Sequence, residues 1–177
     1  MLLAVLAPVL IACQMSASPV CEVAQPSNIK TGILQQEFID LLQRSATFRR
    51  QCARIAATRV LRVTLHIGQV PNPLARAQTI INRYEAGGIR AEVTLRFAED
   101  YLELLAHEFE HIIEQIDGVS LPDEAFQGRA WRTPSGAFET RRAFEAGLRA
   151  REEYEALAPE AVHVDSAKSV ARKPPFD

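Results

Sequence analysis

The sequence predicts a single α+β domain, and three observations lead to this prediction. Hydrophobic residues make up 47% of the 177 residues, which is enough for one core. Residues 60–67 and 89–97 alternate apolar and polar side chains as half-buried strands do. The stretches between and around them have the 3.6-residue period of helices. We therefore expect a small mixed sheet packed against helices.

The folded domain is predicted to span residues 31–158, between a linker at 20–30 and a disordered tail at 159–177. Glycine and proline at 118–137 predict a long loop, which is usually functional or mobile in a compact domain. The pairing of the two strands is left open between parallel and antiparallel. In chain order we expect helices at 31–44 and 48–57, a strand at 60–67, a helix at 74–86, a strand at 89–97, and helices at 99–117 and 138–157.

The formal net charge of −2 gives no electrostatic reason to expect nucleic acid as a partner. The oligomeric state is left open. The first nineteen residues, 1–19, are predicted to be an export signal, because Leu2–Ala12 has the length of a signal-peptide core. Leu10-Ile11-Ala12-Cys13 resembles the bacterial lipobox, in which the cysteine is lipidated, and cleavage near Ala17 is the alternative. Either route implies an exported protein that is periplasmic, secreted or attached to a membrane through Cys13.

Export favours a disulfide between the two remaining cysteines, Cys21 and Cys52. The bridge would close a loop of about thirty residues and stabilise the fold by about 3–4 kcal/mol in the chain-entropy model. Two unpaired thiols are the alternative.

A His-Glu-x-x-His motif lies in the predicted helix 99–117. On a helix, His107 and His111 lie about 40° apart, opposite the apolar stripe. Two imidazoles one turn apart can bind one Zn²⁺ at roughly 2.0–2.1 Å. Glu108 can accept the proton of a metal-bound water that attacks a carbonyl group. The alternative is a solvated helix face, since further glutamates crowd the polar side: Glu103, Glu110 and Glu114.

A catalytic zinc ion needs a third protein ligand and an open position. We favour Glu139, in the first turn of the predicted helix 138–157, on a face of small residues that allows close approach to the central helix. The alternative is that Glu139 only stabilises the N-terminal end of its helix through the helix dipole. Glu145, about 120° from that face, is the second choice. Asp117 holds the last-ligand position of the metzincin motif, but the glycine that motif needs for a chain reversal is replaced here by glutamate.

With these residues, 89–150 resembles the zincin metallopeptidases, and a glutamate on a following helix is similar to their gluzincin branch. The resemblance implies zinc-dependent hydrolysis of a peptide or protein, with Glu108 as the general base. It also implies an edge strand that binds extended substrate, for which 89–97 is expected. The segments Ala-His-Glu-Phe-Glu-His and Phe-Glu-Thr-x-x-Ala are also similar to small exported uncharacterised bacterial proteins. The chain departs from well-studied gluzincins in lacking Asn-Glu-x-x-x-x-Asp around the third ligand. An exported metal-binding or scaffold protein without turnover is the alternative function.

Overall fold

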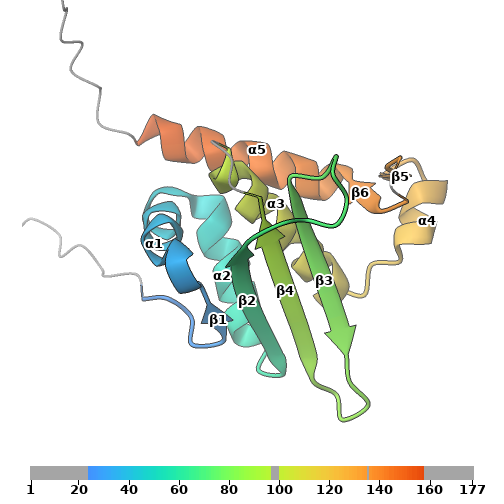
Figure 1. Cartoon of the computed structure of the whole chain (residues 1–177), viewed down its shortest axis with the longest axis horizontal. Helices are drawn as coiled ribbons and strands as arrows, with labels where there is room; N and C mark the ends of the chain where they lie inside the picture. Colours follow the sequence, from blue (N-terminus) through green and yellow to red (C-terminus); the bar gives the residue numbers. More distant parts are fainter. Residues whose placement is uncertain (1–23, 97–99, 135, 158–177) are drawn as a thin grey trace, which may run out of the picture.

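A four-stranded mixed sheet runs through the middle of the protein (Figure 1). The structure is a computed structural model that describes residues 24–96, 100–134 and 136–157. The strands are β1 (Ile29–Lys30), β2 (Leu61–Ile67), β3 (Ala77–Arg83) and β4 (Ile89–Leu95), in the spatial order β1-β2-β4-β3. β1, β2 and β4 are parallel, and β3 is antiparallel to β4.

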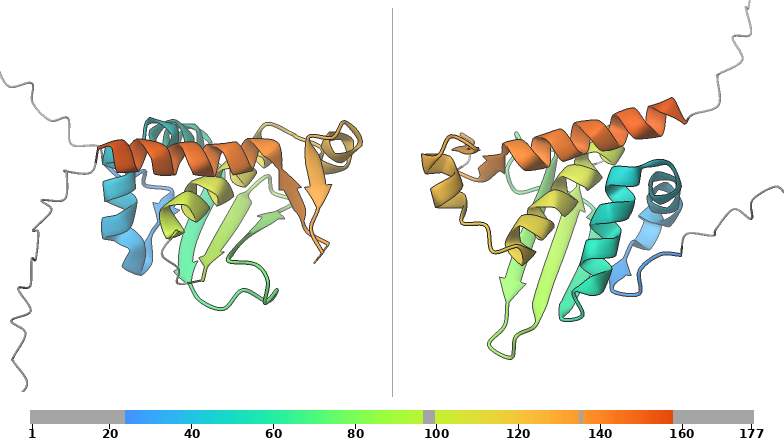
Figure 2. Two further views of the ribbon diagram at one scale, coloured as in Figure 1. Left: turned by 90° about the horizontal axis from the view of Figure 1, so that it is seen from above. Right: turned by 180° about the vertical axis from the view of Figure 1, so that it is seen from behind.

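Helices cover one face of this sheet, so the predicted α+β class is confirmed. A 3₁₀ turn (Gly32–Leu34) leads into α1 (Gln35–Arg44) and α2 (Ala46–Ala57). The histidine-bearing helix is α3 (Tyr101–Ile116), and the last helix is α5 (Arg141–Ala156). Seen from behind, α2 and α3 lie side by side over the sheet and α5 crosses them near one end of it (Figure 2).

The core lies between the sheet and these helices. Alternate side chains of β2 and β4 are buried toward the helices, while Arg62, His66 and Arg90 on the other face are exposed, as half-buried strands require. On the helical side Phe38, Phe48 and Phe109 form an aromatic cluster, with ring centroids 5.1–6.2 Å apart. This cluster fixes the buried side of α3, and so sets which of its side chains face outward.

The prediction of a helix at 74–86 is wrong, because Ala77–Arg83 is strand β3. Thr79, Ile80 and Ile81 are β-branched and favour an extended backbone. A tight turn then joins β3 to β4, with hydrogen bonds between Tyr84 and Gly88 and with Gly87 at φ 82°. An antiparallel hairpin therefore replaces the expected helix, and the two predicted strands, whose pairing was left open, are parallel neighbours.

The predicted long loop at 118–137 contains a short helix, α4 (Leu121–Phe126), and a strand, β5 (Ala130–Arg132). β5 pairs with β6 (Phe138–Thr140) in a two-stranded hairpin, so the last helix begins at Arg141 and not at Phe138 as predicted. At the other end, the expected linker at 20–30 finishes inside the sheet, because Ile29 and Lys30 pair with β2.

Several predictions fall wholly or partly outside the described residues. They are the export signal with Cys13, the pairing of Cys21 with Cys52, and the tail at 159–177. Cys52 lies buried in α2, where burial raises the pKa of its thiol, and it has no disulfide partner among the described residues. Its disulfide stays a prediction. Among the helices that the structure describes, none has the length and apolar character needed to span a membrane.

At Gly147, α5 lies close against α3. A Cβ at this position would lie 2.9 Å from the Glu103 carbonyl oxygen and 3.2 Å from His107 Cβ. We expect Gly147→Ala to lower the free energy of unfolding by about 1–3 kcal/mol, because α5 would have to move away from α3. Gly88→Ala is the matched control, since its Cβ would meet only Tyr84 at 3.8 Å. Urea denaturation of both variants tests this, and equal stabilities would contradict the close approach.

Candidate metal centre

Two histidines one helical turn apart and a glutamate from a later strand converge on one point. His107 and His111 come from α3, and their Nε2 atoms are 3.1 Å apart. Glu139 Oε2 lies 2.9 Å from the first of these nitrogens and 3.5 Å from the second. Donor atoms held tetrahedrally at zinc-ligand distances are about 3.3 Å from one another. The three separations bracket this value, so the residues present fit a zinc ion.

Glu139 reaches the histidines from a strand and not from the predicted helical turn. It is the middle residue of β6, directly opposite Trp131 of β5. The next residue, Thr140, is the N-cap of α5, and its hydroxyl accepts a hydrogen bond from the Ala143 amide at 3.0 Å. The cap and the hairpin together hold the Glu139 backbone extended, with its side chain toward α3.

Glu114 supports the pair from behind. Its Oε2 is 2.9 Å from His111 Nδ1, and its Oε1 accepts the Thr140 hydroxyl at 2.6 Å. A carboxylate can only accept, so the Nδ1 nitrogen of His111 carries hydrogen and its Nε2 faces the cluster. Glu114 is 2% exposed, so the solvated-face reading does not hold for this residue. Sequence reasoning missed this role because it placed Glu114 on a polar helix face, although the i,i+3 spacing from His111 was a signal for it.

The electrostatics of the cluster favour a cation. Burial lowers the pKa of His111, but hydrogen bonds to Glu114 and Glu139 outweigh this effect and raise it to about 10. Burial also works against the charge of Glu139, yet hydrogen bonds from His107 and His111 hold its pKa at about 2. These carboxylates stabilise positive charge at the point where the three donor atoms meet, whether a proton or a metal ion carries it.

Glu108 lies beside the cluster without belonging to it. Its Oε2 accepts a hydrogen bond from the Thr79 hydroxyl of β3 at 2.6 Å. The residue is 6% exposed, and burial raises its pKa despite the two nearby imidazoles. A carboxylate with a raised pKa is a stronger proton acceptor, as a general base requires. Nothing in the sequence singled out Thr79, since the expected helix would have pointed it elsewhere.

These residues open onto a cavity of about 800 Å³, which we call the central cavity. His107, Glu108, His111 and Glu139 line it, together with residues of β3 from Ala77 to Ile81. β3 is the free edge of the sheet on this side, whereas β4 lies between β2 and β3. The expectation that 89–97 is the edge strand is therefore wrong, because the unpredicted strand β3 covers it.

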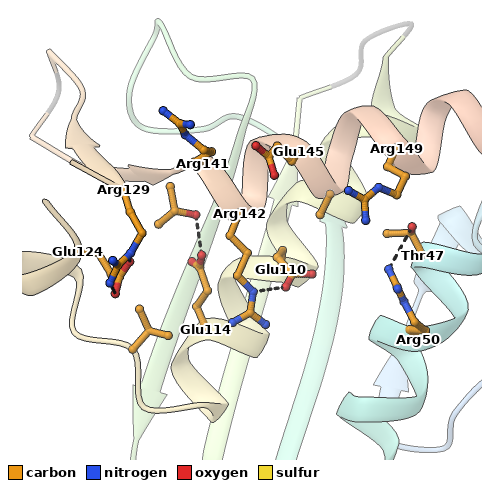
Figure 3. Close-up of a pocket in the computed structure, with 13 residues that line it drawn as sticks. Thr47, Arg50, Glu110, Glu114, Glu124, Arg129, Arg141, Arg142, Glu145 and Arg149 are labelled. Atoms are coloured by element: carbon orange, nitrogen blue, oxygen red, sulfur yellow. Dashed lines mark hydrogen bonds and ion pairs between the residues drawn. The ribbon is translucent and has the colours of Figure 1, made fainter. Parts of the chain in front are cut away.

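The two alternative third ligands lie elsewhere. Asp117 caps the end of α3 and forms ion pairs with Arg54 and Arg142, each at 3.0 Å. Glu145 is exposed and lines a second pocket of about 420 Å³ on the other side of α5 (Figure 3).

The same second pocket is lined by Glu110, a further buried glutamate of α3. It accepts a hydrogen bond from Arg142 at 2.6 Å (Figure 3). It accepts another from Gln51 at 2.7 Å. Glu110 is buried, 8% exposed, and its charge is paired with Arg142 of α5. Glu103, the remaining glutamate of the three on the polar side of the helix, pairs with Arg151 of α5. The polar side of α3 is thus a packed interface with α2 and α5, with the two histidines at its opening.

Comparison of this chain with protein-family models, with curated proteins and with solved structures gave no match. The reasoning about function therefore starts from the geometry of the three donor atoms, the neighbouring carboxylate and the cavity into which they open.

Proposed function

We propose that the protein is a zinc-dependent peptidase. The observation that carries the proposal is the convergence of His107, His111 and Glu139, with donor-atom separations of 2.9–3.5 Å. A structural zinc site would use a fourth protein ligand, whereas this set has three and borders a cavity. Three ligands with an open side are typical of catalytic zinc.

His107, His111 and Glu139 would hold the ion, and a bound zinc ion would polarise a substrate carbonyl group and lower the pKa of water. Glu108 accepts the proton from the attacking water, with its carboxylate held by the Thr79 hydroxyl. The new C–O bond forms in this attack. Glu108 then delivers the proton to the leaving amine, and the C–N bond of the peptide breaks. Glu114 keeps His111 in one orientation throughout.

The free edge of β3 is where we propose that an extended peptide binds. Residues 77–82 carry no charged residue and no Pro, the residues that usually block an edge strand, and Arg83 stands at the far end of β3. A peptide that paired with this edge would run past Thr79, and therefore past Glu108. The strand would supply backbone hydrogen bonds that do not depend on peptide sequence.

The predicted export signal adds the proposed location, outside the cytoplasm or attached to the cell envelope. A metal-binding protein without turnover is the competing function. It shares the zinc site and differs only in lacking hydrolysis.

Zinc content and peptide hydrolysis test the proposal together. We expect one zinc per chain by elemental analysis, and hydrolysis of unstructured peptides that a chelator stops and added Zn²⁺ restores. His107→Ala and His111→Ala should each lose both properties. His66→Ala is the matched control, because His66 is exposed on β2 outside the cluster. A pure protein that takes up no zinc would overturn the site, and zinc without hydrolysis would favour the competing function.

A further inference from the structure

Large apolar side chains stand exposed around the central cavity. Trp131 is 47% exposed, Phe144 is 48% exposed and Leu74 is 78% exposed, and all three line this cavity. They come from three separate segments: β5, the first turns of α5, and the loop before β3. Exposed apolar groups that gather at one concave site from distant parts of a chain mark a binding surface.

The register of the β5–β6 hairpin brings one of these side chains next to the metal centre. Trp131 and Glu139 are directly opposite each other, so their side chains project from the same face of the hairpin. Directly opposite residues have Cβ atoms about 4.5–5.5 Å apart. The indole is thus within a side chain's length of the Glu139 carboxylate, where the reacting bond of a substrate would lie.

The charged side chains of the cavity are already engaged with other groups. Arg76 pairs with Asp100, and Glu103 pairs with Arg151. The remaining charged or ionisable lining residues belong to the centre or are bonded to it: His107, Glu108, His111, Glu114 and Glu139. Among the described lining residues, every charged group therefore already has a partner within the protein.

We propose that Trp131, Phe144 and Leu74 form a subsite that selects an aromatic or large aliphatic side chain next to the scissile bond. This inference rests on the proposed peptidase function. Burial of such a side chain against the two rings would stabilise the transition state, whereas a charged side chain would lose its hydration without gaining a partner.

Peptides that differ at the two positions flanking one cleavable bond test this preference. We expect kcat/KM for Phe or Leu at one of these positions to exceed that for Ala or Lys by roughly tenfold to a hundredfold. Trp131→Ala and Phe144→Ala should each reduce that ratio severalfold at unchanged zinc content. Phe126→Ala is the control, since Phe126 is 94% exposed and does not line the cavity. It should change neither the rate nor the ratio.

A binding measurement keeps the inference separate from the proposed function. Trp131 is the single tryptophan of the chain, so tryptophan fluorescence reports on the proposed subsite alone. In zinc-loaded Glu108→Gln protein, a Phe-containing peptide should shift the emission at lower concentration than its Ala counterpart. Hydrolysis without apolar preference, or equal binding of both peptides, would overturn the subsite. Selective binding without hydrolysis of any peptide by the wild-type protein would uphold the subsite and overturn the peptidase.

Discussion

Glu108→Gln should lower kcat by about 10²–10⁴-fold and leave the zinc content at one per chain. The substitution keeps the size of the side chain and its ability to accept a hydrogen bond from Thr79, but removes the carboxylate that accepts a proton. Glu108 is not one of the three converging donors, so the metal site should stay intact. Single-turnover hydrolysis and elemental analysis of one protein batch provide both readings.

Two further substitutions separate general-base chemistry from simple disruption of α3. Glu110→Gln changes another buried glutamate of the same helix, one that pairs with Arg142 away from the central cavity, and kcat should be unchanged. Thr79→Val removes the hydroxyl that holds Glu108 and should lower kcat with little change in KM. Thr79→Ser keeps a hydroxyl at this position and should keep kcat near that of the wild-type protein. Full activity in Glu108→Gln would exclude this residue as the base.

Glu139→Ala should weaken zinc binding by roughly a hundredfold or more. Loss of a group that only supports a ligand typically costs 10–100-fold in metal affinity, so loss of a ligand should cost at least the upper end of that range. Competition with a chromophoric chelator measures the dissociation constant. The effect should appear as a loss of affinity with retained folding, because Glu139 is partly exposed on a short hairpin.

Glu145→Ala and Asp117→Ala are the matched controls for the third ligand. Glu145 is exposed toward the second pocket, so its loss should leave zinc affinity unchanged. Asp117→Ala breaks two ion pairs with Arg54 and Arg142 and should affect stability rather than zinc. If Glu145→Ala released the metal and Glu139→Ala did not, the assignment would have to be reversed.

The sequence was most informative where the signal was local. The spacing of His107 and His111 fixes their proximity once α3 is helical, and the apolar stripe of α3 predicts which side is buried. The clean alternation at 89–97 likewise predicted β4. These inferences need only the geometry of a single element.

The errors arose where two elements compete or cooperate. Residues 74–86 satisfy a helical period, and only pairing with β4 makes the extended form of 77–83 the stable one. The β5–β6 hairpin is too short for a periodic signal. Thr133 and Gly136 lie in its turn, with Gly136 at φ 84°, and the helix was predicted to begin at Phe138, which belongs to β6. Thr140, the true N-cap, was therefore overlooked.

Burial of charge was the least predictable property. Glu110 and Glu114 appear on a helical wheel as a solvated face, yet both are buried. Their partners come from other segments: Arg142 and Thr140 near the start of α5, and Gln51 on α2. No single-element pattern contains that information, because the partners are brought together only by tertiary packing.

The β5–β6 hairpin has a consequence for how this protein could change. It lies outside the main sheet, and its exposed Trp131 stands across from Glu139. Substitutions at this tryptophan would cost little stability, because the side chain is not part of the core. On the proposed function, single mutations at this position can therefore change the substrate preference at little cost in stability, while the two histidines and Glu108 on α3 stay unchanged. Libraries randomised at positions 131 and 144 would be a compact starting point for redirecting the proposed peptidase activity.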